Sequence, residues 1–175
     1  LVLSGYLMWG CLPLYWALLN HVNPSEVLIH RMLWAVPVLF FLVHFKSSWK
    51  NNFKASISSK KELVFLFITA ILITINWGGY IYAVNLGRVV EASMGYFLSP
   101  VINMIGGYIF FQERISKLKQ LAVFFATVGA LYYVFSGDSF PWLGFLVGFT
   151  FSAYGIARKA MASSAVPGLY VETLI

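Results

Sequence analysis

Five long runs of the chain contain no aspartate, glutamate, lysine or arginine, and they constrain its fold more than any other feature. The runs cover residues 1–25, 63–87, 92–112, 120–137 and 139–157. A helix needs about 20 apolar residues to cross the hydrocarbon core of a bilayer. Only 10% of the 175 residues are charged, against about 25% in a soluble domain. The runs therefore predict an all-α polytopic membrane protein.

A sixth span is predicted after residue 23, although its uncharged part is short. Residues 32–45 number only 14, too few to cross alone, so the helix spans only if Arg31 enters the membrane with it. The motif NPSE at residues 23–26 provides an N-cap, a proline at the first helical position and a glutamate at the third. A helix from Pro24 to about His44 places Arg31 roughly 10 Å inside.

Positive charges collect in alternate loops. Ten of the twelve lysines and arginines follow the second, fourth and sixth predicted spans, while Arg88 lies in an opposite loop and Arg31 within a span. Because cytoplasmic loops carry an excess of lysine and arginine, the N-terminus is predicted to be cytoplasmic. The net charge of +6 is explained by membrane topology, so no nucleic-acid partner is expected.

The one long loop, residues 45–62, is basic and has an amphipathic pattern. Aromatic or aliphatic residues recur every four positions from Phe45 to Ile57, and lysines follow with the same spacing. This pattern suits a helix lying on the inner leaflet. A disordered basic linker is an equal alternative.

Two short patterns recur along the chain. A glycine, an aromatic residue and a leucine, followed by a tyrosine ten positions after the glycine, occur at residues 5–15 and 144–154. The pattern E-x-L-I occurs at residues 26–29 and 172–175. A unit with an odd number of spans inserts upside down when it repeats, and inverted repeats are typical of secondary transporters. The predicted domains are a five-helix repeat and the truncated start of a second, residues 1–137 and 138–175.

A stripe of polar and small residues runs down the fourth span. It consists of Glu91, Gly95, Ser99, Asn103 and Gly107. Close helix packing explains the glycines, but an amide at the depth of Asn103 needs a partner or a water-lined cavity. Pro100 leaves the carbonyl of Tyr96 free and is expected to bend the helix. A polar pocket near the midplane follows from these features.

Aromatic residues at mid-depth add candidates on two other spans. Trp9 shares a face with Pro13 on the first span, and Asn76, Trp77 and Tyr80 lie on the third. Tryptophan and tyrosine usually mark the membrane interface, but Trp77 and Tyr80 are too deep for that. Either packing or ligand stacking explains them.

Arg31 and Glu91 are the two charges whose role is most open. An arginine at a helix centre costs about 2.5 kcal/mol or more, so Arg31 should face the bundle interior. It either pairs with Glu26 or Glu91, or attracts an anionic or zwitterionic substrate. Glu91 either stabilises the start of its own helix or carries a proton or cation.

Catalytic and metal-binding patterns are not found. The sequence has no glycine-rich phosphate loop, no metal-ligand spacing and no nucleophile with a matching base. We therefore expect no enzyme activity, no metal and no cofactor.

Several segments resemble RarD-type permeases of the drug/metabolite transporter superfamily, which are built of EamA domains. The most specific lies in residues 75–114, INWGGYIYAVNLGRVVEASMGYFLSPVINMIGGYIFFQER; MWGCLPLYW at 8–16 and EVLIHRMLWA at 26–35 add to it. The resemblance implies a ten-helix protein of two inverted five-helix repeats in the bacterial inner membrane. Six spans would then lie in this chain, most of the second repeat being absent.

These observations predict a secondary transporter of small polar or amphipathic organic solutes that works by alternating access, with the lipid bilayer and a small-molecule substrate as partners. A non-transporting membrane scaffold is the alternative, and a homodimer is left open. Glu91 and Arg31 are candidates for coupling or for an ion pair, and Pro13 and Pro100 for hinges. The predicted substrate-binding residues are Trp9, Arg31, Asn76, Trp77, Tyr80, Tyr96 and Asn103.

Overall fold

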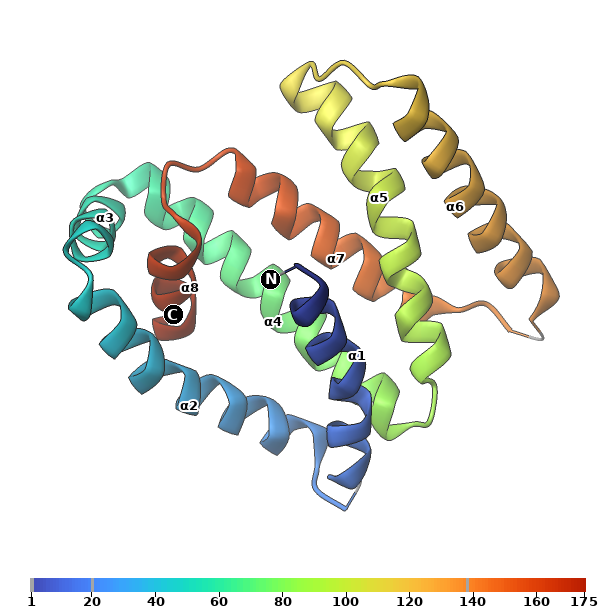
Figure 1. Cartoon of the computed structure of the whole chain (residues 1–175). Helices are drawn as coiled ribbons and strands as arrows, with labels where there is room; N and C mark the ends of the chain where they lie inside the picture. Colours follow the sequence, from blue (N-terminus) through green and yellow to red (C-terminus); the bar gives the residue numbers. More distant parts are fainter. Residues whose placement is uncertain (1, 20, 138) are drawn as a thin grey trace.

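The structure is a computed structural model that describes residues 2–19, 21–137 and 139–175, and the described part folds into eight helices (Figure 1). Predictions for residues 1, 20 and 138, including the first residue of the predicted second repeat, lie outside the described residues. The helices are α1 (Val2–Leu18), α2 (Pro24–Phe45), α3 (Ser47–Ser58), α4 (Lys60–Asn85), α5 (Val89–Phe111), α6 (Lys117–Ser136), α7 (Trp142–Lys159) and α8 (Ala165–Leu174).

Four helices of the described part, α2, α4, α5 and α6, are long and apolar enough to cross a membrane. This agrees with the prediction of a polytopic helical membrane protein. The other two predicted spans correspond to α1, which has 17 residues, and α7, which has 18 and ends with two basic residues. The count of six spans stays a prediction.

The start of α2 confirms the predicted N-cap. The Oδ1 atom of Asn23 accepts a hydrogen bond from the backbone N–H of Ser25 at 3.0 Å, and Pro24 is the first helical residue. Helix α2 ends at Phe45, one residue beyond the predicted His44. Arg31 therefore lies well inside a helix of membrane-crossing length.

The basic loop forms a helix, so the alternative of a disordered linker is wrong. Its residue Phe53 packs against a small core formed by Leu39, Val43 and Tyr170, with 5.2 Å between the ring centroids of Phe53 and Tyr170. The amphipathic face of α3 is thus partly covered by α2 and α8. Its position on the inner leaflet stays a prediction.

Helix α7 packs between α4 and α5, and its contact with α5 depends on glycines (Figure 1). A Cβ atom placed on Gly148 would lie 2.6 Å from the carbonyl oxygen of Gly95, and one on Gly144 would lie 2.5 Å from that of Glu91. Real Cβ atoms do not approach backbone this closely, so the two helix backbones touch. Close packing, predicted for Gly95, is confirmed.

An ion pair joins the far ends of α5 and α7. The ammonium of Lys159 contacts the carboxylate of Glu113, which follows α5. The hydrogen bond from Lys159 and its positive charge lower the pKa of Glu113 below its usual range. Both side chains are about half exposed, so the pair lies at the surface.

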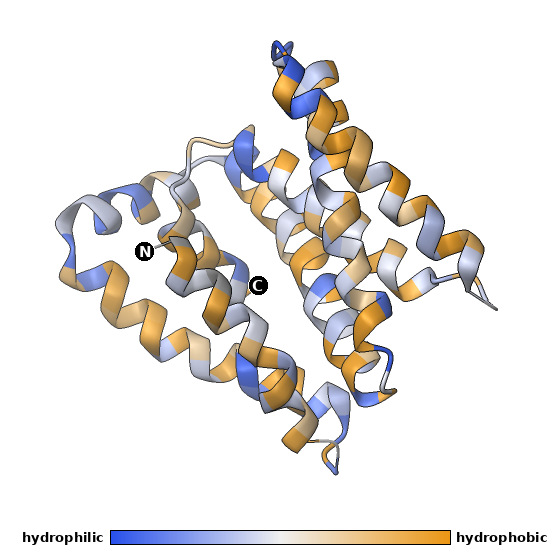
Figure 2. Cartoon of the chain, turned by 45° about the vertical axis from the view of Figure 1, so that its right-hand side comes forward, coloured by the Kyte–Doolittle hydropathy of each residue, from blue (hydrophilic) through white to orange (hydrophobic). Residues whose placement is uncertain are grey.

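Hydrophobic residues make up much of the long helices (Figure 2), and many of their large apolar side chains are exposed. Helix α6 is the clearest case, because Phe124, Phe125 and Phe135 are all more than half exposed. A soluble domain does not leave so much contiguous apolar surface in water. This surface fits contact with lipid.

Candidate functional site

A cavity of about 730 Å³ lies among α1, α2, α4, α5 and α7. Six of the seven predicted substrate-binding residues line it, and so do both predicted hinge prolines. The full lining is Trp9, Gly10, Leu12, Pro13, Trp16, Arg31, Trp77, Tyr80, Ser93, Tyr96, Phe97, Ser99, Pro100, Asn103 and Phe151. Residues far apart in the sequence are thus brought to one place.

Arg31 projects into this cavity between two indole rings. Its Cζ atom lies 3.9 Å from the ring centroid of Trp77 and 5.8 Å from that of Trp16. Among the residues that the structure describes, no carboxylate lies within ion-pairing distance of Arg31. A desolvated cation–π contact contributes about 2 kcal/mol, against an insertion cost of about 2.5–3.5 kcal/mol for arginine. The rings therefore offset most of that cost without an acid.

Three of the predicted aromatic residues, Trp9, Tyr80 and Tyr96, form one cluster with Phe151. The ring centroid of Tyr96 lies 5.6 Å from Trp9, 5.9 Å from Tyr80 and 5.5 Å from Phe151, and Trp9 and Phe151 are 5.9 Å apart. These are normal distances for interacting aromatic pairs. One side of the cavity is thus an apolar wall built from four helices.

Pro13 and Pro100 both lie inside continuous helices, α1 and α5. Because proline has no N–H, Pro100 leaves the carbonyl of Tyr96 without its helical donor, and both residues line the cavity. The exposed amide of Asn103 lies one turn further along the same lining. The predicted polar pocket on α5 is present, and the hinge role of the prolines stays a prediction.

Asn76 is placed outside the cavity. Its side chain is buried, and its Nδ2 atom donates hydrogen bonds to the carbonyl of Val147 at 2.8 Å and to the hydroxyl of Thr150 at 3.1 Å. A buried amide needs such partners. Asn76 therefore joins α4 to α7 instead of facing the cavity with Trp77.

Glu91 is buried and connects two helix ends. One carboxylate oxygen accepts the backbone N–H of Leu143 at 2.8 Å, and the other lies 2.6 Å from the guanidinium of Arg88. Leu143 is in the first turn of α7, whose N–H groups lack partners within the helix. Glu91 therefore caps an N–H at the start of α7, and it also lies in the first turn of α5, where the helix dipole favours its charge. The alternative pair between Glu91 and Arg31 is not formed.

Some lining residues were not among the predicted site residues. Trp16 follows Trp9 and Pro13 at helical spacing, so this spacing could have indicated it. Ser99 belongs to the polar stripe of α5, and Ser93 lies on the same helix. Phe151 carries no such signal, because α7 is rich in phenylalanine and only the packing of α7 against α5 brings this ring to Tyr96.

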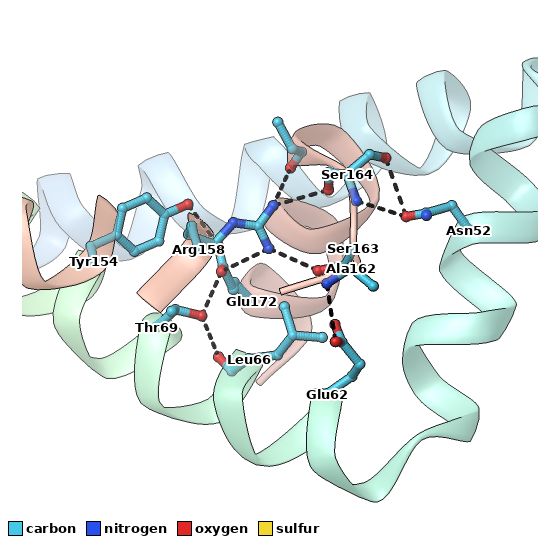
Figure 3. Close-up of polar contacts among 11 residues, drawn as sticks. Asn52, Glu62, Leu66, Thr69, Tyr154, Arg158, Ala162, Ser163, Ser164 and Glu172 are labelled. Carbon is cyan, nitrogen blue, oxygen red and sulfur yellow. Dashed lines mark hydrogen bonds and ion pairs between the residues drawn. The ribbon is translucent and has the colours of Figure 1, made fainter. Parts of the chain in front are cut away.

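A second polar cluster joins α4, α7 and α8 (Figure 3). The buried carboxylate of Glu172 accepts hydrogen bonds from the hydroxyls of Thr69 at 2.6 Å and Tyr154 at 3.1 Å. Arg158 lies 3.6 Å from the same carboxylate. It also donates to the hydroxyl of Ser163 at 3.2 Å and the carbonyl of Ser164 at 2.9 Å. Each of these side chains has a partner within the cluster, and the cluster was not predicted.

In the described parts of the chain, no group of three or more histidine, cysteine, aspartate or glutamate side chains could hold a metal ion. The charged residues near the cavity are Arg31 and, at the end of α5, the pair of Glu91 and Arg88. Neither arrangement offers a nucleophile with a base. The cavity around Arg31 is therefore the candidate site.

Comparison with known proteins gives one family and several relatives. The family described as the EamA-like transporter family matches residues 1–135. The chain is 35% identical to the "Uncharacterized transporter YojE" of Bacillus subtilis, over 98% of the chain and 58% of that protein. It is 34% identical to "Protein RarD" of Escherichia coli, over 99% of the chain and 58% of that protein. The chain thus spans less than two thirds of these relatives, and no solved structure gives a significant match.

Proposed function

Because the chain belongs to the EamA-like transporter family, we propose that it forms part of a secondary transporter of small polar or amphipathic organic solutes. Its relatives include proteins named as transporters and RarD proteins. The protein is therefore a multi-pass membrane transporter and not an enzyme. The substrate class and the alternating-access mechanism are the proposed part.

The cavity is the observation that carries this proposal. Its volume of about 730 Å³ is in the usual range for small-molecule sites, about 300–1,000 Å³. Its lining combines a large apolar wall with one charge and a few polar groups, as such sites usually do. A solute of modest size with a polar end fits this lining.

The repeat pattern supports alternating access. We propose that residues 1–137 are a first five-helix repeat and that residues 138–175 begin an inverted second one, which gives ten helices in all and six spans here. Helix α7, from the second repeat, packs against α4 and α5 of the first. Transporters built in this way bind their solute between repeats and move one repeat against the other, with Pro13 and Pro100 as bends.

The type of membrane is proposed from the relatives, and the orientation of the protein in it from the distribution of lysine and arginine. The curated relatives are bacterial, so we place the protein in the bacterial inner membrane. The lysine-rich helix α3 and the basic end of α7 would face the cytoplasm together with the N-terminus. A coupling role for Glu91 is the weaker part, since both of its oxygens are already partnered.

The scaffold alternative predicts tightly packed, dry interfaces between the helices. The contact of Gly144 and Gly148 with α5 is of that kind, but the cavity among α1, α2, α4, α5 and α7 is not. A protein that only packs against partners does not need Arg31 in a cavity, where it contacts two indole rings. The cavity therefore favours transport.

The test is solute flux by the whole protein in proteoliposomes, screened over organic solutes with and without a pH gradient. Saturable flux above that of protein-free vesicles is expected for at least one solute. Trp77→Ala should reduce this flux at least about tenfold, because an aromatic ring that lines the cavity is lost. Ile109→Ala, on the exposed face of α5, is the matched control. No flux for any solute, with correctly inserted protein, would refute the transporter.

A further inference from the structure

The charge of the cavity lining is unbalanced. Of the described residues that line it, Arg31 alone carries a charge, and the remaining polar groups are hydroxyls, three indoles and one amide. The nearby acid Glu91 is held by Arg88 and by the start of α7. The lining thus presents one positive charge to whatever occupies the cavity.

The way Arg31 is held leaves its hydrogen-bond donors free. A guanidinium stacks on a ring with its flat face, while its five N–H donors lie in the plane of the group and point outward from its edge. Trp77 and Trp16 contact Arg31 as cation–π partners. No described side chain forms an ion pair with it. The edge of the guanidinium is therefore positioned, without being occupied, for a planar two-oxygen acceptor.

The rest of the lining suits a flat apolar body. Tyr96 contacts Trp9, Tyr80 and Phe151, so several ring faces and edges border the same space. Tyr96 also lies near enough to Arg31 for an electrostatic interaction. The cation and the aromatic wall are thus neighbours, and one small molecule can reach both.

We propose that this cavity selects aromatic organic anions, with the carboxylate on Arg31 and the ring system against the cluster around Tyr96. This rests on the proposed transport function and adds its substrate class. A positively charged amine is disfavoured, because it would lie beside Arg31 and the described lining residues include no carboxylate to receive it. A neutral amide of the same shape keeps the aromatic contacts and loses the charge-assisted hydrogen bonds.

The experiment measures binding of three probes of similar shape to the whole protein in phosphatidylcholine nanodiscs, which contain no anionic lipid. The probes are indole-3-acetate, indole-3-acetamide and tryptamine. Their binding is measured by equilibrium dialysis of the radiolabelled compounds. We expect the acid to bind at least about tenfold more tightly than the amide, a ratio typical of one lost charge-assisted contact, and tryptamine to bind most weakly.

Variants of Arg31 test whether this side chain causes the difference in affinity between the acid and the amide. Arg31→Gln should weaken the acid at least about tenfold and leave the amide within about twofold, so the amide also reports that the cavity is intact. Arg31→Lys keeps the charge but not the planar fork, so intermediate affinity for the acid is expected. Lys50→Gln removes one positive charge from exposed α3 and should change nothing.

Several outcomes would overturn the proposal. They are equal affinity for acid and amide, preference for tryptamine, wild-type affinity of Arg31→Gln for the acid, and no saturable binding of the acid. The proposed function is judged separately by flux. Flux of neutral solutes without preference for anions would refute only the anion site, whereas binding of the acid by a protein without flux for any solute would refute only the transporter.

Discussion

Arg158 and Arg31 both lie on helices of the bundle, yet their surroundings differ. Arg158 has a carboxylate, a hydroxyl and backbone carbonyls around its guanidinium (Figure 3). Arg31 has two indole faces and no acid among the described residues. One charge is satisfied by the fold itself, and the other is held in place with its donors free. The difference separates a structural arginine from one available to a ligand.

The same contrast extends to the helices around them. On the closed side, α7 and α8 contact α4 and α5 through buried polar groups and through glycines that bring backbones together. On the open side, α1, α2, α4 and α5, with Phe151 of α7, surround a cavity of about 730 Å³. Substitutions on the closed side should change stability, and those on the open side should change binding.

The largest expected effect is the loss of Arg158. Arg158→Ala leaves the buried carboxylate of Glu172 without its counter-charge, and breaking such a buried pair costs about 3–5 kcal/mol. Thr69 and Tyr154 still donate to Glu172, so we expect the lower end of that range. Chemical denaturation of the whole protein in detergent measures it.

Arg31→Gln is the matched comparison in the same assay. Because Arg31 is not part of an ion pair among the described residues, its removal leaves no buried acid unpaired and should change stability by less than about 1 kcal/mol. If both variants lost the same amount of stability, the claim that Arg158 is structural and Arg31 is not would be contradicted.

The next largest effect concerns the α5–α7 contact. Gly148→Ala places a methyl group against the backbone of Gly95, and such overpacking costs about 1–3 kcal/mol. Gly129→Ala on α6 meets nothing within 4 Å and should stabilise by up to about 1 kcal/mol through helix propensity. Opposite signs in thermal melts of the two variants are expected, and the same sign would contradict the close packing of α5 and α7.

A smaller change in stability is expected for substitutions of Glu91. Glu91→Ala removes the acceptor for the N–H of Leu143 and should cost about 1 kcal/mol, as the loss of a helix cap does. Glu91→Gln keeps an oxygen acceptor and should lose less. Flux in proteoliposomes should persist in Glu91→Gln with its dependence on the pH gradient unchanged. Loss of that dependence would instead make Glu91 a coupling group.

The smallest effect belongs to the exposed pair of Glu113 and Lys159. The lowered pKa of Glu113 means that the pair contributes stability above the ordinary pKa of glutamate and loses it as the pH falls through the lowered value. Lys159→Gln should therefore reduce stability slightly at neutral pH and not at strongly acidic pH. Melting curves of both proteins across this pH range test the sign, and an effect that grows toward acid would contradict it.

Local features of the fold could be predicted because they depend on neighbouring residues. The N-cap at Asn23 and the start of α2 at Pro24 follow from hydrogen bonding within one turn. The small-residue stripe of α5 indicated close packing, and Gly95 meets α7 there. Whether residues 45–62 form a helix or a disordered linker could not be decided in this way, because Phe53 packs against Tyr170 of α8, which is distant in the sequence.

The candidate site could be predicted in part. Aromatic and polar side chains at membrane depth need a partner or a ligand. This predicts six residues that do line the cavity, Trp9, Arg31, Trp77, Tyr80, Tyr96 and Asn103. Asn76 met the same criterion but faces α7, since depth does not say which side of a helix a residue occupies. Glu91 caps a helix 52 residues away in the sequence, which no local pattern indicates.

The membrane environment and the family of the chain follow from the sequence, because the length of the apolar runs, the distribution of charges and the motif residues are properties of short segments. Which buried groups meet depends on the packing of the helices: Arg31 lies on Trp77 and Trp16 with no described carboxylate within ion-pairing distance, while Glu91 is held by Arg88 and α7. Pairing of buried groups depends on which helix faces meet, and the packing of α7 between α4 and α5 sets those faces. A charge that the sequence marked as costly is thereby left available for a ligand.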